Sequence, residues 1–210
     1  TRESIRMFYP DSFYERRDVV AERGRYDLQA RFLDGYPRGR VLDIGCAGGA
    51  FLKVLQERGW QAFGMDLVET KNEYGLPIRY GQLPELGYAS EYFDAVTAWA
   101  VFEHLHDPKA YFQEVGRILK PGGHCVCLVT NVNSLWSRFA YAEDIPRHLY
   151  FYSRDTLRRY AALGGLRVER IDYSGRIFPP DSTDVFRVRL LRRLGFGWRE
   201  IYRSSDRLPV

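Results

Sequence analysis

Cysteine is scarce in this sequence, and long apolar runs are absent from it. Only three of the 210 residues are cysteine, too few for the disulfide framework of a small secreted domain. No stretch approaches the roughly 18 consecutive apolar residues that a membrane-spanning helix requires, and the sequence does not begin with a secretory signal pattern. We therefore expect a cytoplasmic protein with reduced thiols and no membrane span.

Lysine is also scarce, since only four of the 31 basic residues are lysine. Residues 1–146 hold 17 basic and 20 acidic side chains, whereas residues 147–210 hold 14 and 7. All 14 basic residues of the second part are arginine, whose planar guanidinium suits phosphate or carboxylate. They indicate an anionic partner, or only a general use of arginine in place of lysine. A net charge of +4 without a recognition motif argues against nucleic-acid binding.

A glycine-rich turn between two apolar segments carries most of the functional information. A short β-like run contains Asp43, and the turn from Gly45 to Gly49 then opens a helix. A second β-like run, residues 61–65, ends just before Asp66. In open α/β sheets such glycines let the backbone approach a ligand, and an acid at the end of the second strand binds ribose hydroxyls. The pattern therefore predicts a site for an adenosine-containing cofactor.

Strand-like and helix-like segments alternate from Arg40 onward. Two helices start at typical N-cap residues, Asp107 followed by proline, and Ser153. The alternation predicts an α/β fold with a doubly wound, mostly parallel, Rossmann-like sheet. The expected strands are residues 40–44, 61–65, 78–80, 93–98, 124–130 and 166–173, and the expected helices are residues 49–59, 107–121 and 153–164.

Parallel strands joined by right-handed crossovers end at one edge of the sheet, where ligands bind. Residues at or just past the strand ends should therefore line a single crevice. These residues are Asp43, Asp66, Gln82, Trp99 and Asn131.

Further motifs follow the glycine turn in a recognisable order. They are Phe93-Asp94-Ala95-Val96, Phe102-Glu103-His104-Leu105, Asp107-Pro108, Leu119-Lys120-Pro121-Gly122-Gly123 and Arg147-His148-Leu149-Tyr150-Phe151-Tyr152-Ser153. With residues 41–46 and Asp66, this order resembles class I S-adenosylmethionine-dependent methyltransferases over roughly residues 38–173. The resemblance is strongest to the small-molecule group that includes ubiquinone-biosynthesis O-methyltransferases and enzymes of polysaccharide and natural-product clusters.

The resemblance implies a binding site for S-adenosylmethionine. It implies that Asp43 anchors the turn and, usually through water, the methionine amine. It also implies that Asp66 binds both ribose hydroxyls. Gln82 and its neighbour fall where the family contacts adenine, and the end of the fourth strand falls beside the methyl group. Ala47 replaces the usual middle glycine of the turn and fits if its φ is negative. The expected cofactor-binding residues are Asp43, Gly45, Cys46, Ala47, Gly49, Asp66, Leu67, Gln82, Leu83, Ala98 and Trp99.

The resemblance also predicts the organisation of the chain as one methyltransferase domain over residues 1–210. The family closes its sheet with an antiparallel last strand, which the short, proline-containing C-terminus makes short or incomplete here. The expected parts are a helical N-terminal cap (1–38), a cofactor-binding core (39–130), an acceptor-side connection (131–152) and the C-terminal part of the sheet (153–210).

The expected reaction is methyl transfer to a small acceptor, at a hydroxyl of a sugar, a polysaccharide precursor or a natural product. Such a hydroxyl loses a proton, and His148 in the acceptor-side connection is the first candidate for a general base. His104 is the second candidate, and a purely structural role is the alternative for His148. Arg147, Arg187, Arg189, Arg192 and Arg193 suit an anionic or glycan-type acceptor, and Trp136, Phe139, Tyr141, Tyr150 and Phe151 suit either an apolar acceptor pocket or plain core packing.

A metal site is not expected. Glu103, His104 and His106 cluster in the sequence, and some RNA-terminal methyltransferases of this superfamily use Glu-x-x-Glu-His as metal ligands. Position 100 is alanine, which breaks that motif, so activity is expected to survive a chelator.

Two other classes of function stay open. A paralogue that binds the cofactor without catalysis would keep the same motifs. An NAD-dependent oxidoreductase would also need a glycine turn and a second-strand acid, but its fingerprint places glycines at 45, 47 and 50, and both Ala47 and Ala50 depart from it.

Overall fold

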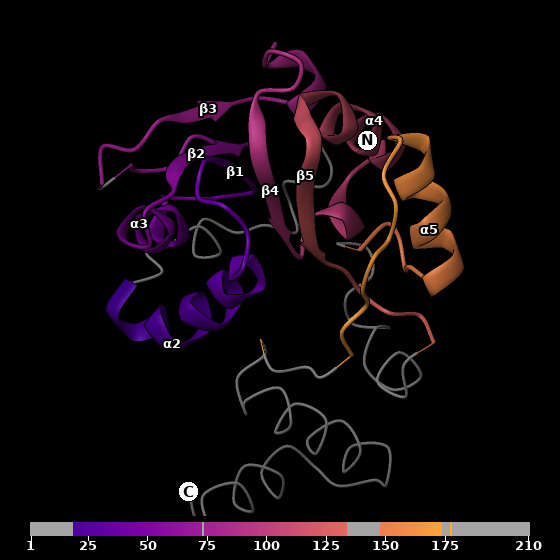
Figure 1. Cartoon of the computed structure of the whole chain (residues 1–210), viewed down its shortest axis with the longest axis horizontal. Helices are drawn as coiled ribbons and strands as arrows, with labels where there is room; N and C mark the ends of the chain where they lie inside the picture. Colours follow the sequence, from indigo (N-terminus) through magenta and orange to yellow (C-terminus); the bar gives the residue numbers. More distant parts are fainter. Residues whose placement is uncertain (1–18, 73, 134–147, 174–176, 178–210) are drawn as a thin grey trace, which may run out of the picture.

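The computed structural model describes residues 19–72, 74–133, 148–173 and 177. In that part, helices flank a twisted five-stranded sheet (Figure 1). The elements are α2 (Val19–Ala30), η3 (Arg31–Leu33), β1 (Arg40–Ile44), α3 (Ala50–Glu57), β2 (Gln61–Asp66), β3 (Ile78–Tyr80), η4 (Leu83–Glu85), β4 (Phe93–Trp99), η5 (Phe102–His104), α4 (Pro108–Ile118), β5 (Leu119–Leu128) and α5 (Arg154–Leu163).

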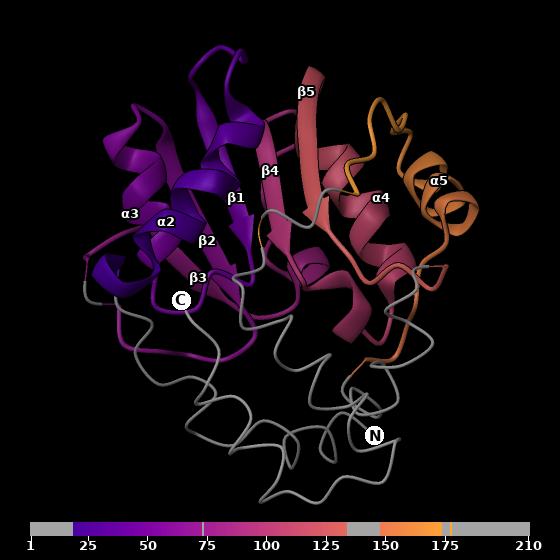
Figure 2. The same cartoon turned by 90° about the horizontal axis from the view of Figure 1, so that it is seen from below.

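The sheet has the order β3-β2-β1-β4-β5, and all its pairings are parallel. Helices α2 and α3 lie on one face, and α4 and α5 lie on the other (Figures 1 and 2). Each face has its own apolar core, one built around Leu52 and Leu55 of α3 and one around Phe112 and Val115 of α4. This arrangement confirms the doubly wound parallel sheet and brings the carboxyl ends of β1, β2 and β4 to one edge.

The helix starts follow the local signals in the sequence. The Asp107 carboxylate accepts a hydrogen bond from the backbone N–H of Ala110 at 3.0 Å, and this caps α4. Ser153 and Thr156 form a reciprocal capping box at the start of α5. Both predicted starts are confirmed, because a cap depends only on residues that are close in sequence.

The boundary between α4 and β5 differs from the prediction. The proline and glycines of 120–123, expected to end the helix, already belong to β5, which begins at Leu119. The pairing of β4 with β5 shifts register between Phe93 and Ala95. Lys120 reaches back to the Asp94 carboxylate at 2.6 Å, and Gly122 has a positive φ of 77°. A register shift of this kind accommodates residues that a regular strand excludes.

The strand expected over residues 166–173 is not formed. These residues carry no strand assignment, and among the residues that the structure describes β5 pairs only with β4. The expected antiparallel last strand falls in residues outside the described part. No helix of that part is long and apolar enough to cross a membrane.

The N-terminal and acceptor-side segments are described in part. Helix α2 and η3 agree with the helical character expected for residues 1–38, of which residues 1–18 lie outside the described part. The connection 131–152 is seen at its two ends, which meet in a parallel bridge between Asn131 and Tyr152. The connection therefore returns to the sheet edge from which it leaves.

Candidate cofactor and acceptor site

Asp43 lies inside the sheet with its carboxylate toward β4. Its side chain is buried, and its Oδ1 accepts a hydrogen bond from the Thr97 hydroxyl at 2.6 Å. Burial raises the pKa of Asp43 to about 8, the Thr97 hydrogen bond opposes that shift, and the charge of Asp66 adds to it. A carboxyl group held in this way favours a cation, such as an ammonium group, that enters next to it.

Asp66 ends β2 and closes the glycine turn. Its Oδ2 accepts a hydrogen bond from the backbone N–H of Ala47 at 2.8 Å, and its Oδ1 accepts one from the backbone N–H of Val68 at 3.2 Å. Burial raises the pKa of Asp66, whereas these backbone hydrogen bonds lower it. Each carboxylate oxygen has a further lone pair, so Asp66 can still accept hydrogen bonds from a pair of ligand hydroxyls.

The glycine turn passes close to the loop that follows β4. The backbone N–H groups of Gly45 and Cys46 both donate to the carbonyl of Met65, at 2.8 and 3.1 Å. Gly45 has a φ of 76°, and a Cβ there would lie 2.6 Å from a methyl of Val101. Only glycine fits such a position. Glycine at position 45 therefore lets the turn pack against Val101 of the loop that follows β4.

Ala47 has a positive φ of 47°, so the condition of a negative φ, under which alanine was to fit the turn, is not met. A left-handed conformation costs a residue with a Cβ about 1–2 kcal/mol. The conformation directs the Ala47 N–H to the Asp66 carboxylate. The tertiary hydrogen bond thus sustains a strained backbone that the sequence alone did not indicate.

The residues expected near adenine belong to a small hydrogen-bonded unit with α4. The Tyr111 hydroxyl donates to the Gln82 side-chain oxygen at 2.8 Å, and the Leu83 N–H lies 3.3 Å from that hydroxyl. The Leu83 side chain is fully buried. The Gln82 oxygen keeps one lone pair for a ligand amine, and Tyr111 fixes its orientation.

The remaining cofactor candidates lie at the same strand ends with different exposure. Trp99 packs edge to face on Phe32 and Phe51, at ring distances of 6.0 and 5.8 Å. Cys46 is buried, and burial raises the pKa of its thiol. Ala98 is fully buried, Leu67 is 49% exposed, and Gly49 caps α3 with a φ of 86°. The side chains of Trp99 and Ala98 thus serve the two cores.

On the acceptor side, the structure brings together Glu103, His104 and His148. One potential ligand atom of each lies within 4.8 Å of the others. The imidazole rings of His104 and His148 are 4.6 Å apart and meet at 71°. His106, grouped with Glu103 in the sequence, is exposed and does not belong to this cluster. Sequence spacing could not reveal the set, because His148 comes from the far end of the connection.

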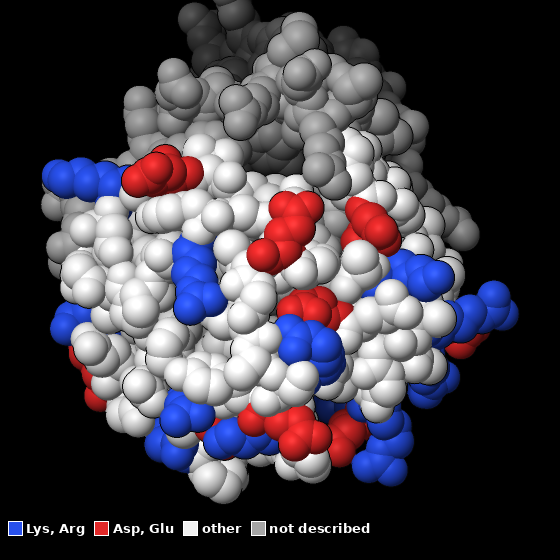
Figure 3. All heavy atoms as spheres, turned by 90° about the horizontal axis from the view of Figure 1, so that it is seen from above, with Lys and Arg blue, Asp and Glu red and all other residues white. Residues whose placement is uncertain are grey.

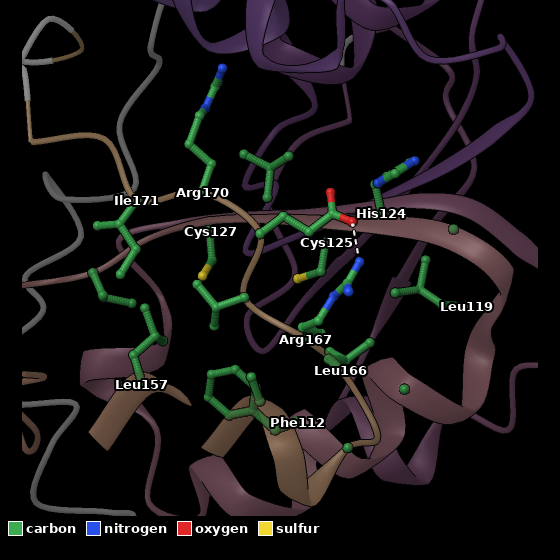
Figure 4. Close-up of a pocket in the computed structure, with 18 of the residues that line it drawn as sticks. Phe112, Leu119, His124, Cys125, Cys127, Leu157, Leu166, Arg167, Arg170 and Ile171 are labelled. Carbon is green, nitrogen blue, oxygen red and sulfur yellow. Dashed lines mark hydrogen bonds and ion pairs between the residues drawn. The ribbon is translucent and has the colours of Figure 1, made fainter. Parts of the chain in front are cut away.

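A cavity of about 1040 Å³ lies elsewhere, beside β5 (Figure 4). Cys125 and Cys127 of β5 face it together with Phe112 and Leu166, where the expected sixth strand does not form. Trp99 and Asn131 also line it, but neither aspartate of the turn does. The cavity is therefore distinct from the crevice at the glycine turn, and the three cysteines are free.

The face shown in Figure 3 does not single out an anion-binding surface. Basic and acidic side chains are interspersed over the face shown in Figure 3. Arg154, Arg158 and Arg159 of α5 are exposed. The arginines and aromatic residues proposed for the acceptor from the sequence lie outside the described residues in most cases, namely Trp136, Phe139, Tyr141, Arg147, Arg187, Arg189, Arg192 and Arg193.

Replacing Asp43 by asparagine is expected to stabilise the ligand-free protein at pH 7 by about 1–3 kcal/mol, the scale of a polar group buried with incomplete compensation. Asparagine can still accept the Thr97 hydrogen bond. Unfolded Asp43 loses its proton near its ordinary pKa of 3.8, but folded Asp43 keeps it up to about pH 8. Between these values the unfolded chain binds fewer protons, so the free energy of unfolding falls as pH rises.

Urea unfolding of both proteins at pH 4.5 and pH 7.5 measures this effect. The advantage of the asparagine variant should be small at the lower pH and larger at the higher one. An advantage that is equal at both pH values would show that the Asp43 carboxyl is not held protonated by the fold.

Comparisons with known proteins point in one direction. The family model described as a methyltransferase domain matches residues 16–171. A ubiquinone biosynthesis O-methyltransferase of Dinoroseobacter shibae is 31% identical over 189 residues, which cover 80% of this chain and 74% of the relative. Another such enzyme, from Alkalilimnicola ehrlichii, is 32% identical, and the match covers 52% of this chain and 49% of the relative.

Among solved structures, a SAM-dependent methyltransferase of Archaeoglobus fulgidus matches with a TM-score of 0.61 at 22% identity, over 81% of this chain and 84% of the other. The cyclase SpnF matches with a TM-score of 0.60, also at 22% identity, over 79% and 65% of the two chains. These likenesses show the fold alone.

Proposed function

Because this chain belongs to the S-adenosylmethionine-dependent methyltransferase family, we propose that it transfers the cofactor's methyl group to a hydroxyl of a small acceptor. The observation that carries the proposal is the pair of acids, buried Asp43 and partly buried Asp66, at the ends of β1 and β2 on either side of the glycine turn. Relatives named as ubiquinone biosynthesis O-methyltransferases support an oxygen acceptor on a small molecule. A sugar or polysaccharide precursor is a narrower choice within that class.

The residues of the turn account for binding of the cofactor. When bound, the cofactor supplies a methyl group already activated by its sulfonium. Asp66 would accept hydrogen bonds from the two ribose hydroxyls, and Asp43 would balance the charge of the methionine amine. Gln82 would accept a hydrogen bond from the adenine amine. Its side-chain oxygen has one lone pair left for this after it accepts the hydrogen bond from Tyr111. The turn keeps this conformation because Gly45, which has no side chain, fits against Val101.

The residues after β4 account for the acceptor. Because the methyl group is already reactive, the protein must mainly align the acceptor oxygen with it and exclude water. His104, on the loop that follows β4, lies beside His148 from the far end of the connection, and Val101 of that loop lies next to the glycine turn. We assign to His148 the orientation of the acceptor hydroxyl and the removal of its proton, with His104 as its partner. We also propose that the reaction takes place in the cytoplasm, where the three free thiols would stay reduced.

Three competing functions are weighed against specific observations. A cyclase shares this fold at a TM-score of 0.60, so the fold by itself does not establish methyl transfer. An NAD-dependent enzyme is disfavoured because Ala50, where its fingerprint needs glycine, is buried as the first residue of α3. A paralogue that binds without catalysis would have no use for two imidazoles next to a buried carboxylate.

The purified chain is expected to bind S-adenosylmethionine and adenosylhomocysteine with micromolar dissociation constants, and NAD not at all. Isothermal calorimetry and thermal shift measure this directly. Methyl transfer is then followed by mass spectrometry over catechols, small hydroxy acids and sugar nucleotides. The proposal fails if neither cofactor form gives heat or a thermal shift. If the cofactor binds but no acceptor is methylated in a panel that includes the cellular extract, the non-catalytic alternative holds.

A further inference from the structure

We propose that Tyr111 of α4 determines the specificity of the site for adenine, because it holds the side-chain amide of Gln82 in one orientation. An amide fixed in this way fits a 6-amino purine and rejects the deaminated, 6-oxo counterpart. The inference rests on the proposed function, since it takes the ligand to be an adenosine-containing cofactor whose ribose is bound by Asp66. Neither the acceptor nor the two histidines enter it.

Gln82 lies directly past the strand end that faces the ribose ligand. Strand β3 pairs with β2 so that Tyr80 is opposite Asp66, and the Gly81 backbone N–H donates to the Asp66 carbonyl at 2.9 Å. Gln82 follows as the N-cap residue of η4 and is half-buried. A base attached to a ribose on Asp66 would therefore have the Gln82 side chain as its neighbour on the side of β3.

The directions of two hydrogen bonds determine how the Gln82 amide is oriented. The Leu83 backbone N–H can only donate, and it donates to the Tyr111 hydroxyl oxygen at 3.3 Å. The hydroxyl then donates its own proton, and Oε1 of Gln82 accepts it at 2.8 Å. If the amide were reversed, the hydroxyl would face a second N–H donor and its proton would lose this acceptor. The two bonds therefore direct Oε1 of Gln82 toward α4 and Nε2 away from it.

Burial makes this orientation costly to reverse. Tyr111 is only 3% exposed, and its ring belongs to the apolar core that contains Phe112 and Val115 of the same helix. The side chain of Leu83 is fully buried, and the carbonyl of Gln82 accepts the Glu85 backbone N–H at 2.9 Å within η4. A buried hydroxyl that loses its acceptor pays the full cost of desolvation. The amide should therefore keep one orientation before any ligand binds.

A fixed amide matches the edge of adenine that carries the N6 amine and the N1 lone pair. Oε1 of Gln82 would accept from the amine through its second lone pair, and Nε2, which donates to no group within the described part of the chain, would donate to N1. Hypoxanthine presents the reverse pattern, because it has a carbonyl at position 6 and a hydrogen on N1. An amide free to turn over would fit both bases, whereas the amide held by Tyr111 fits adenine alone.

Calorimetric dissociation constants for adenosylhomocysteine and its deaminated analogue, S-inosylhomocysteine, test the proposal without any acceptor. The parent should prefer the adenosyl ligand by about 100-fold or more, because both hydrogen bonds of the fixed amide are mismatched in the analogue. In Tyr111→Phe the amide can turn over, so the preference should fall to about 10-fold or less. Tyr88→Phe is the matched control and should keep the parental ratio, since Tyr88 is also buried but its hydroxyl donates to the Gly64 carbonyl, at 3.4 Å.

Two results would overturn the proposal: equal binding of both ligands by the parent, or the full parental ratio in Tyr111→Phe. A merely structural role of Tyr111 would weaken both ligands alike and leave that ratio unchanged. If Tyr111→Phe does not fold, the 1-deaza analogue of adenosylhomocysteine, which lacks the N1 acceptor, decides on the parent. It should bind about 10-fold more weakly or worse, and equal binding would contradict the proposal. If the parent does not bind adenosylhomocysteine itself, the proposed function fails instead.

Discussion

Replacing Asp66 by alanine is expected to weaken S-adenosylmethionine binding by at least 100-fold. Two ribose hydroxyls that donate to a carboxylate make charge-assisted hydrogen bonds, each worth about 1.5–3 kcal/mol. The change also removes the acceptors of the Ala47 and Val68 backbone N–H groups, which close the turn in its ligand-ready form. Both effects lower affinity, and neither acts on the acceptor side.

Calorimetry with adenosylhomocysteine gives the dissociation constants of parent and variant. Glu69→Ala is a suitable control, because Glu69 is exposed, acidic and only three residues away. The dissociation constant of Asp66→Asn should lie between those of the parent and of Asp66→Ala, since one acceptor oxygen and its backbone hydrogen bond survive. Circular dichroism should show a folded protein in every case. A dissociation constant unchanged in Asp66→Ala would mean that another group binds the ribose.

Replacing His148 by alanine is expected to lower turnover by about 100-fold or more, the usual scale for loss of a group that removes or stabilises a proton. Cofactor affinity should stay within a few-fold of the parent. The segment of His148 is held on Glu103 by backbone hydrogen bonds from Leu149 and Tyr150, which the substitution leaves in place.

Single-turnover measurement with saturating cofactor separates this chemical effect from binding. His106→Ala serves as control for a nearby imidazole outside the cluster and should retain parental turnover. If His148→Ala keeps turnover within a few-fold of the parent, the residue is structural. The acceptor proton would then leave to water or to His104, and alignment alone would account for the rate.

Several features could be predicted because they depend on residues close in sequence. The caps at Asp107 and Ser153 are of this kind, since an N-cap side chain needs only the N–H two or three residues ahead. The first four described strands were placed to within one residue for the same reason, as apolar β-like runs of suitable length, whereas β5 begins before the predicted start. Their parallel direction followed from the helices between them.

The errors arose where partners distant in sequence decide the local conformation. The Ala47 backbone is left-handed because Asp66, from the next strand, accepts its N–H. The residues around Pro121 joined β5 because a register shift opposite Phe93 makes room for them. Residues 166–173 had the composition of a strand, but a cavity rather than a ladder separates them from β5. In each case local propensity was overridden by tertiary contacts.

The same division runs through the functional site. The sequence by itself determined the cofactor half, because Asp43, the glycine turn and Asp66 occupy consecutive strand ends, and a parallel sheet brings such ends together. The acceptor half was decided only by the tertiary structure. Glu103 and His148 are brought within 4.8 Å by the return of the connection to η5, a contact that depends on packing and backbone hydrogen bonds between distant segments. No spacing along the chain encodes such a contact in a single sequence.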